Sequence, residues 1–151
     1  MDLNLVTLTP ATDDDREFSY QAKKAAEGDY ITAIWGWNEQ IQRRFHIRAW
    51  EERRPDIIRY DGKPVGTLYA REEEGCFHIR QFFILPEWQR KGIGSCLLER
   101  VLAQADRTGL VAKVAFLKGN RVQSLYERFG FRLTSQRDNF CFMQRQPKET
   151  A

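Results

Sequence analysis

The clearest signal in the sequence is the segment Phe83-Ile84-Leu85-Pro86-Glu87-Trp88-Gln89-Arg90-Lys91-Gly92-Ile93-Gly94. It leads from an apolar strand through a Pro-Glu turn and a basic loop into an amphipathic helix. The two glycines let the backbone turn tightly and approach a ligand without a Cβ clash. The first amides of the helix lack internal partners, and the helix end carries partial positive charge. The stretch therefore predicts an anion site, to which Arg90, Lys91 and the Ser95 hydroxyl add donors.

The Gly92-Ile93-Gly94 pattern has a second interpretation, an ordinary turn with a basic flank that starts a helix. It differs from two better-known phosphate loops, because it lacks the third glycine of the dinucleotide fingerprint and the Gly-Lys-Ser/Thr of the nucleoside triphosphate loop. By itself the pattern leaves the choice between a ligand site and a plain turn open.

The elements on either side follow from hydrophobic periodicity and turn signals. We expect strands at residues 3–8, 56–60, 64–71, 76–85, 110–117, 131–134 and 140–144. We expect helices at residues 12–28, 30–50, 93–109 and 122–129. This order predicts an α+β fold, in which an antiparallel meander is joined to a crossover unit.

The composition fits a single globular domain over residues 1–151, with 42% hydrophobic residues and a net charge of +3. Acidic residues interrupt the basic ones throughout, which argues against nucleic acid as a partner. We expect no secretory leader, and no apolar run approaches the ~18 residues of a membrane span, so a cytoplasmic protein is predicted. Three cysteines and two distant histidines predict reduced thiols and no metal cluster.

The stretch around the two glycines resembles the acetyl-CoA-binding motif of the GNAT superfamily of N-acetyltransferases, Gln/Arg-x-x-Gly-x-Gly/Ala after an apolar strand and a Pro-Glu turn. A second stretch resembles the next conserved block of that family: Gly119-Asn120-Arg121, followed by Ser124-Leu125-Tyr126-Glu127-Arg128-Phe129-Gly130-Phe131. The resemblance implies a mixed, mostly antiparallel sheet of about seven strands, flanked by about four helices and splayed between the fourth and fifth strands.

The resemblance also implies an enzyme that transfers an acetyl group from acetyl-CoA directly to a primary amine of a small molecule or peptide, without a metal. The amides from Arg90 to Ser95 would bind the pyrophosphate, and the strand around Ile84 would pair with the pantetheine arm. The implied cofactor-binding residues are Phe83, Ile84, Leu85, Gln89, Arg90, Lys91, Gly92, Ile93, Gly94, Ser95, Asn120, Ser124 and Tyr126. For Asn120 and Ser124, capping of the following helix is the alternative.

The chemistry requires a neutral amine, and deprotonating a lysine-like amine at pH 7 costs roughly 4–5 kcal/mol. Many family members place a glutamate on the fourth strand as general base. Here that place falls near His78, whose ordinary pKa near ~6.5 suits the task. A structural histidine at a strand start is the alternative. Tyr126 is the candidate donor to the leaving thiolate, with packing beside Leu125 and Phe129 as its alternative.

The resemblance places the amine acceptor beside the second helical region, where the sequence reads Trp35-Gly36-Trp37-Asn38-Glu39-Gln40. The functional interpretation makes Trp37 an aromatic wall and Glu39 a holder of a cationic amine or a base. The alternative is core packing and a solvated helix face. Gly36 is costly inside a helix, which indicates a break there. Gln81 is a further candidate for orienting substrate or water.

Other functions stay open at this point. A catalytically weak acetyl-CoA-binding regulatory module is the alternative from another class, favoured by the missing glutamate on the fourth strand. A transferase for longer acyl-CoA substrates is a third. Pairing of the last strands between two copies would give a homodimer, which the resemblance allows. No sequence feature chooses the acceptor amine.

Overall fold

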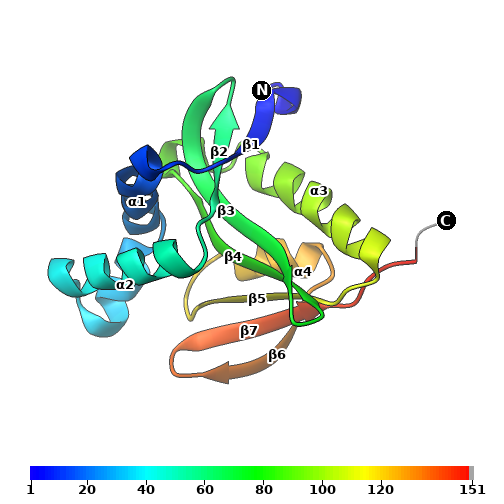
Figure 1. Ribbon diagram of the computed structural model, residues 1–151. Helices are drawn as coiled ribbons and strands as arrows, with labels where there is room; N and C mark the ends of the chain where they lie inside the picture. Colours follow the sequence, from blue (N-terminus) through cyan, green and yellow to red (C-terminus); the bar gives the residue numbers. More distant parts are fainter. Residues whose placement is uncertain (150–151) are drawn as a thin grey trace. The chain divides into compact units, whose positions relative to one another are not determined.

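The computed structural model describes residues 1–149 (Figure 1). The strands are β1 (Val6–Pro10), β2 (Asp56–Tyr60), β3 (Lys63–Glu73), β4 (Cys76–Ile84), β5 (Ala112–Leu117), β6 (Arg132–Arg137) and β7 (Phe140–Arg145). The α-helices are α1 (Arg16–Trp35), α2 (Glu39–Glu52), α3 (Ile93–Thr108) and α4 (Gln123–Arg128). Short 3₁₀ turns are η1 (Leu3–Leu5), η2 (Asp13–Asp15) and η3 (Pro86–Trp88).

The strands form one sheet of seven in the order β1-β2-β3-β4-β5-β7-β6. The pairs β1/β2, β2/β3, β5/β7 and β6/β7 are antiparallel. The pair β4/β5 is parallel, with Phe77 opposite Ala112 and His78 opposite Lys113, and β4 runs on to Ile84. The predicted α+β class with a mixed, mostly antiparallel sheet is confirmed.

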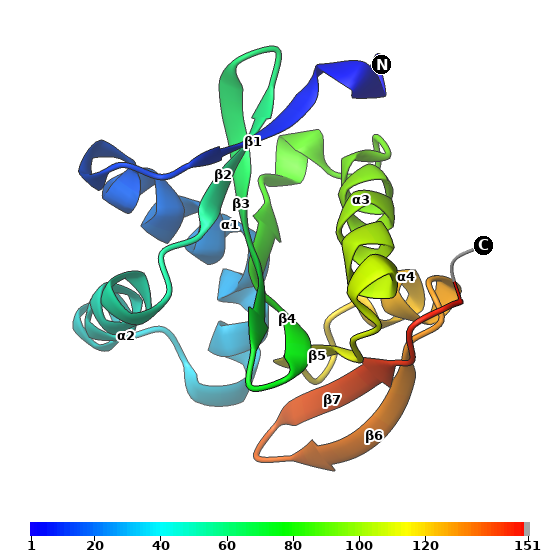
Figure 2. The same ribbon diagram turned by 45° about the vertical axis from the view of Figure 1, so that its right-hand side comes forward.

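The chain forms two compact units, and each is built from two chain segments. The first unit holds residues 1–69 and 81–93, and in it α1 and α2 lie side by side (Figure 1). Of the described chain, the second unit holds residues 70–80 and 94–149, with β6 and β7 as a hairpin (Figure 2). A single domain over residues 1–151 stays a prediction.

The core of the second unit rests on the periodicity of α3. Its apolar side chains recur every three or four residues, so that one stripe of the helix is buried. The buried members of this stripe are Leu97, Leu98, Val101, Leu102 and Ala105. In the first unit, Ile57 and Ile58 of β2 and Val65 and Leu68 of β3 have no more than 1% of their surface exposed.

Two predicted boundaries at the N-terminal end are wrong. The helix expected to end at Gly28 continues to Trp35, and the helix expected at 30–50 begins only at Glu39. A helical glycine costs only about 1 kcal/mol, so Gly28 does not stop α1. The break lies at Gly36, whose φ of 77° few other residues adopt, and the Asn38 side chain then caps α2 by accepting from the Ile41 amide.

The strand expected at 3–8 starts later, at Val6. Leu3–Leu5 instead form a 3₁₀ turn, because the Asp2 carboxylate accepts a hydrogen bond from the Asn4 amide at 2.9 Å. The alternating residues of this segment therefore do not all share one strand, and β1 extends to Pro10 at its other end.

Candidate functional site

The middle of β4 contains a kink at Gln81, which has a left-handed backbone with φ of 48°. Such a conformation costs a non-glycine residue about 1–2 kcal/mol and persists only when its surroundings hold it. Thr67 Oγ1 donates to the Gln81 carbonyl at 2.7 Å, and Gln81 Nε2 donates to the Arg53 carbonyl at 2.7 Å. The Gln81 side chain thus anchors β4. Its predicted role toward substrate stays a prediction.

Gly66 of β3 lets the two strands approach closely just after this kink. A Cβ atom at Gly66 would overlap the Phe83 carbonyl oxygen and lie 3.1 Å from Ile84 Cα. The Leu85 amide also donates to the Val65 carbonyl at 2.9 Å. Gly66 and Thr67 therefore position the segment expected to pair with pantetheine. Sequence reasoning missed both, although a glycine inside a strand pattern is a known sign of close backbone approach.

The glycine loop is tied back to the end of β4. Gln89 Nε2 donates to the Ile84 carbonyl at 2.8 Å. Arg90 and Gly92 both have left-handed backbones, with φ of 61° and 88°. In the described chain the Lys91 amide has no hydrogen-bond partner, and α3 begins at Ile93. Free amides, exposed basic side chains and a helix N-terminus together fit a pyrophosphate group.

In the second block, the polar side chains hold the local turn. Asn120 Oδ1 accepts from the Val122 amide at 3.0 Å, and Ser124 Oγ donates to the Arg121 carbonyl at 3.2 Å. These bonds shape the start of α4. The predicted contacts of Asn120 and Ser124 with pantetheine stay predictions.

Tyr126 of α4 is buried between two aromatic rings. Its ring stacks on that of Phe116, with 5.9 Å between the ring centroids, and packs edge to face against Phe131, with 5.3 Å between the centroids. Burial raises the pKa of the Tyr126 phenol above its ordinary value. The phenol therefore stays protonated at neutral pH, which is the state a hydrogen-bond donor needs.

His78 of β4 is engaged by a neighbouring arginine. Arg80 Nη2 lies 3.2 Å from His78 Nδ1. Because a guanidinium only donates, Nδ1 is the acceptor and the neutral ring carries its proton on Nε2. Burial, together with the positive charge of Arg80, lowers the pKa of His78. The imidazole is therefore neutral at pH 7, and its lone pair is already occupied by Arg80.

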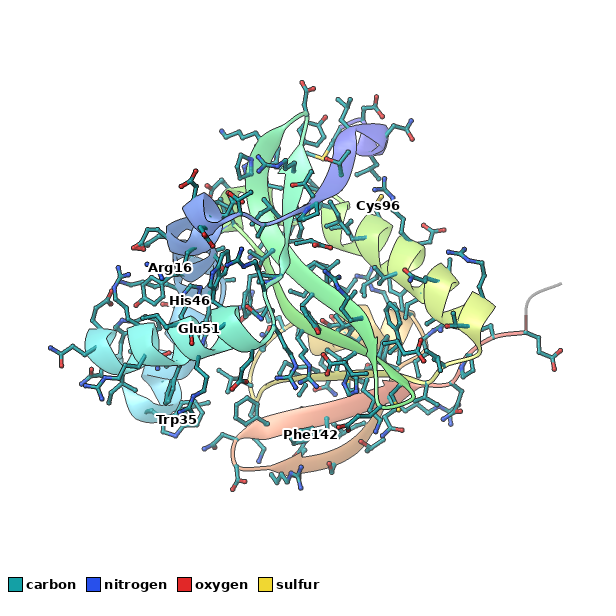
Figure 3. All side chains as sticks on the ribbon, viewed as in Figure 1. Arg16, Trp35, His46, Glu51, Cys96 and Phe142 are labelled. Atoms are coloured by element: carbon teal, nitrogen blue, oxygen red, sulfur yellow. The ribbon has the colours of Figure 1, made fainter. Side chains whose placement is uncertain are left out.

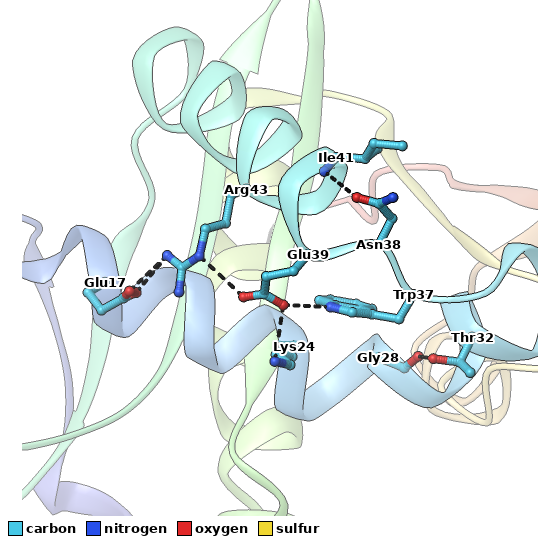
Figure 4. Close-up of polar contacts among 9 residues, drawn as sticks. All are labelled: Glu17, Lys24, Gly28, Thr32, Trp37, Asn38, Glu39, Ile41 and Arg43. Carbon is cyan, nitrogen blue, oxygen red and sulfur yellow. Dashed lines mark hydrogen bonds and ion pairs between the residues drawn. The ribbon is translucent and has the colours of Figure 1, made fainter.

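A network of charges holds the side chain of Glu39 between the two helices (Figure 4). Its Oε2 accepts from Trp37 Nε1 at 2.8 Å and from Lys24 Nζ at 3.2 Å. Its Oε1 accepts from Arg43 Nε at 3.2 Å, and Arg43 also binds Glu17 at 2.9 Å. The hydrogen bond from Trp37 is the largest cause that lowers the pKa of Glu39 to about 2. A carboxylate so well satisfied is a weak base.

Two further titratable side chains pack between these helices. Burial and then the Glu39 carboxylate raise the pKa of Tyr20 to about 12. Burial lowers the pKa of His46 to about 4, and its Nε2 lies 3.1 Å from Ser19 Oγ. His46 is therefore neutral at physiological pH and serves the packing of α1 against α2.

Sequence reasoning did not single out Glu27 of α1. Only 17% of its side chain is exposed, and Lys23 Nζ lies 3.9 Å from Oε1. Burial raises the pKa of Glu27 above its ordinary value. A carboxyl group with a raised pKa has the property that a general base needs near neutral pH.

Neither a membrane span nor a metal centre is found in the described chain. Within residues 1–149, no helix is both long and apolar enough to cross a bilayer. Over the same residues, no cluster of three or more His, Cys, Asp or Glu side chains could hold a metal ion.

Comparison with known proteins gives one family and many similar folds. The model of the acetyltransferase (GNAT) family matches residues 17–131. PaiA N-acetyltransferase from Thermoplasma acidophilum, in complex with coenzyme A, has 14% identity and a TM-score of 0.72, over 93% of this chain and 98% of that chain. The ribosomal-protein-S18-alanine N-acetyltransferase from Escherichia coli has 16% identity and a TM-score of 0.68, over 97% and 96%.

A GNAT family acetyltransferase from Elizabethkingia anophelis with acetyl-CoA bound has 14% identity and a TM-score of 0.65, over 95% of this chain and 99% of that chain. At such identities the likeness shows a shared fold. A comparison with curated protein sequences found no match.

Proposed function

Because the chain belongs to the GNAT family of acetyltransferases, we propose that it transfers an acetyl group from acetyl-CoA directly to a primary amine of a small molecule or peptide. The observation that carries this proposal is the loop from Gln89 to Gly94, tied to β4 by Gln89 and followed at once by the N-terminus of α3. Similar structures that hold coenzyme A or acetyl-CoA support the same cofactor here.

The loop residues would hold acetyl-CoA through complementary charge. The backbone amides from Arg90 to Ser95 would bind the pyrophosphate, and Arg90 and Lys91 would add positive charge. The backbone of Phe83, Ile84 and Leu85 would pair with the amides of the pantetheine arm. Gly66 and the Gln81 kink support this step, because they set the path of that backbone.

In the proposed reaction, the amine nitrogen attacks the thioester carbonyl carbon, and the carbon–sulfur bond breaks. A backbone amide near Ile84 would stabilise the negative charge on the carbonyl oxygen. The Tyr126 phenol, kept protonated by burial, would donate to the departing sulfur. His78 is the candidate base, and the pH profile of His78→Gln tests this role, since a variant that lacks the base loses the acidic limb of kcat/KM.

One observation favours the alternative of a regulatory module that binds acetyl-CoA without turnover. The candidate base His78 already shares its Nδ1 lone pair with Arg80. A release assay for free coenzyme A thiol with a panel of amines separates the two functions. Turnover with any amine excludes the regulatory module, and acetyl-CoA binding without turnover of any amine in the panel supports it.

Titration of the protein with acetyl-CoA by calorimetry, with ATP and NAD as controls, tests the cofactor assignment. We expect saturable heat for acetyl-CoA that Gly92→Glu abolishes. Gly75→Glu is the matched control, because Gly75 is another turn glycine with left-handed φ, at 78°. Absence of heat and of thermal stabilisation by millimolar acetyl-CoA would overturn the assignment.

A further inference from the structure

Helix α2 presents a second, unpartnered stripe to solvent. Ile41, Arg44, Phe45 and Arg48 follow one another at spacings of three, one and three residues, so that they share one face of the helix. Ile41 is 42% exposed and Phe45 is 57% exposed. The buried face of α2 is a different one, formed by Gln42, His46 and Trp50. The stripe is therefore not the side that packs the fold.

The positive charges of the stripe lack a complement within the described chain. Other arginines near α2 have carboxylate partners: Arg43 binds Glu17 and Glu39, and Arg54 binds Asp13. Arg44 and Arg48 form no ion pair with any residue in 1–149. Four residues apart on one helix, these two like charges repel each other. Acidic groups on a partner would complement these two charges.

The apolar residues of the stripe are also typical of a protein-binding surface. Phe45 is a large exposed aromatic flanked by two arginines, a combination that is enriched where proteins bind each other. Trp35, the last residue of α1, is a further exposed aromatic of the first unit, at 55% (Figure 3). A partner that covers this surface brings apolar side chains as well as carboxylates.

We propose that the α2 stripe, Ile41, Arg44, Phe45 and Arg48, docks an acidic, apolar segment of a protein acceptor. This rests on the proposed function and names a protein as the acceptor class. Carboxylates bind the two guanidinium groups, and apolar side chains cover Ile41 and Phe45. A second copy is disfavoured because the stripe would bring arginines against arginines in a symmetric contact. A membrane is disfavoured because two apolar residues make a smaller face than interfacial helices bury.

The test is fluorescence anisotropy with a labelled synthetic peptide rich in glutamate, leucine and phenylalanine. Two further peptides serve as probes of the chemistry, one with lysine for glutamate and one with serine for the apolar residues. The variants are Phe45→Ser and the double variant Arg44→Glu/Arg48→Glu. Ile47→Ser is the matched control, because Ile47 lies on α2 outside the stripe and is 42% exposed, the same fraction as Ile41. Acetyl-CoA binding is measured on every variant.

We expect the acidic apolar peptide to bind saturably, and both stripe variants to weaken it by at least about tenfold, as for central anchor residues. The control variant keeps full affinity, and the other two peptides bind weakly. Absence of peptide binding by the unaltered protein overturns the proposal. So does preferential binding to phosphatidylserine vesicles, or a dimer in sedimentation that Phe45→Ser dissociates. If the unaltered protein binds the peptide but does not bind acetyl-CoA, the result counts against the proposed function, because the peptide assay does not require acetyl-CoA.

Discussion

The guanidinium group of Arg145 binds the carboxylate of Asp106 through two hydrogen bonds, at 2.8 Å from Nη1 to Oδ1 and 3.1 Å from Nη2 to Oδ2. Arg145 Nε also donates to the Phe129 carbonyl at 3.0 Å, and the Lys148 amide donates to Asp106 Oδ1 at 2.9 Å. Only 5% of the Arg145 side chain is exposed. This pair joins the end of β7 to α3 within the second unit.

Arg145→Met is expected to lower the free energy of unfolding by about 3–5 kcal/mol, because it leaves a largely buried carboxylate without its charge partner. Urea denaturation measures this loss. Arg132→Met, at an exposed position of β6, is the control and is expected to change stability by less than about 0.5 kcal/mol.

The ion pair between Arg145 and Asp106 also makes the free energy of unfolding depend on pH in the acidic range. Arg145 is the largest cause that lowers the pKa of Asp106 in the folded protein. The stabilisation is therefore present above the unfolded pKa of about 3.9 and is lost as pH falls through the lower, folded value. The difference in free energy of unfolding between the unaltered protein and Arg145→Met is expected to become smaller below about pH 4. A constant difference down to strong acid would contradict this account.

Gly66→Ala is expected to destabilise the protein by about 1–3 kcal/mol and to weaken acetyl-CoA binding. The added Cβ overlaps the Phe83 carbonyl, so the backbone of β3 or β4 has to move. Thermal unfolding and calorimetry with acetyl-CoA measure the two effects. Unchanged stability would show that β4 does not depend on this close approach.

Gly28→Ala makes the same substitution with the opposite expected sign. Gly28 lies inside α1, and its Cβ would meet Trp37 Cζ3 at 3.7 Å and Lys24 Cγ at 3.8 Å, which are ordinary contacts. Alanine is the better helix former by about 1 kcal/mol, so a higher Tm is expected. A lower Tm would mean that Trp37 packs against α1 more tightly than these distances indicate.

Arg80→Met is expected to raise the pKa of His78, because it removes both a nearby positive charge and the donor to Nδ1. NMR titration of the imidazole signals measures the change. The chain has two histidines, and His46, with a pKa of about 4, serves as the internal control. An unchanged His78 pKa would show that the contact with Arg80 is not formed in solution.

Tyr126→Phe is expected to lower kcat by about 100-fold and to leave KM for acetyl-CoA nearly unchanged, if the phenol donates to the leaving sulfur. The substitution keeps the ring between Phe116 and Phe131, so the fold is retained. Steady-state kinetics decide the matter, with Tyr30→Phe as the control. An unaltered kcat would leave Tyr126 a packing residue only.

Local patterns in the sequence were sufficient to place most of the strands and helices. Strand β2 was predicted with its observed bounds, and helical spacing of apolar residues from Ile93 onward was predicted where α3 lies. These elements depend on periodicity and turn residues within a few positions of each other. The glycine loop was predictable for the same reason, since its two glycines, basic residues and helix start are contiguous.

Other features depended on residues far apart in the chain. From the sequence alone it was possible to predict the class of the sheet, the two family motifs and the position of the glycine loop. The sequence indicated a break at Gly36, and the tertiary structure added that α1 continues through Gly28 up to that break. The tertiary structure also decided that Glu39 is held by Lys24 and that Gln81 is anchored on Arg53. Such partners are 15 and 28 residues away, and a contact at that separation leaves no periodic signal in the sequence.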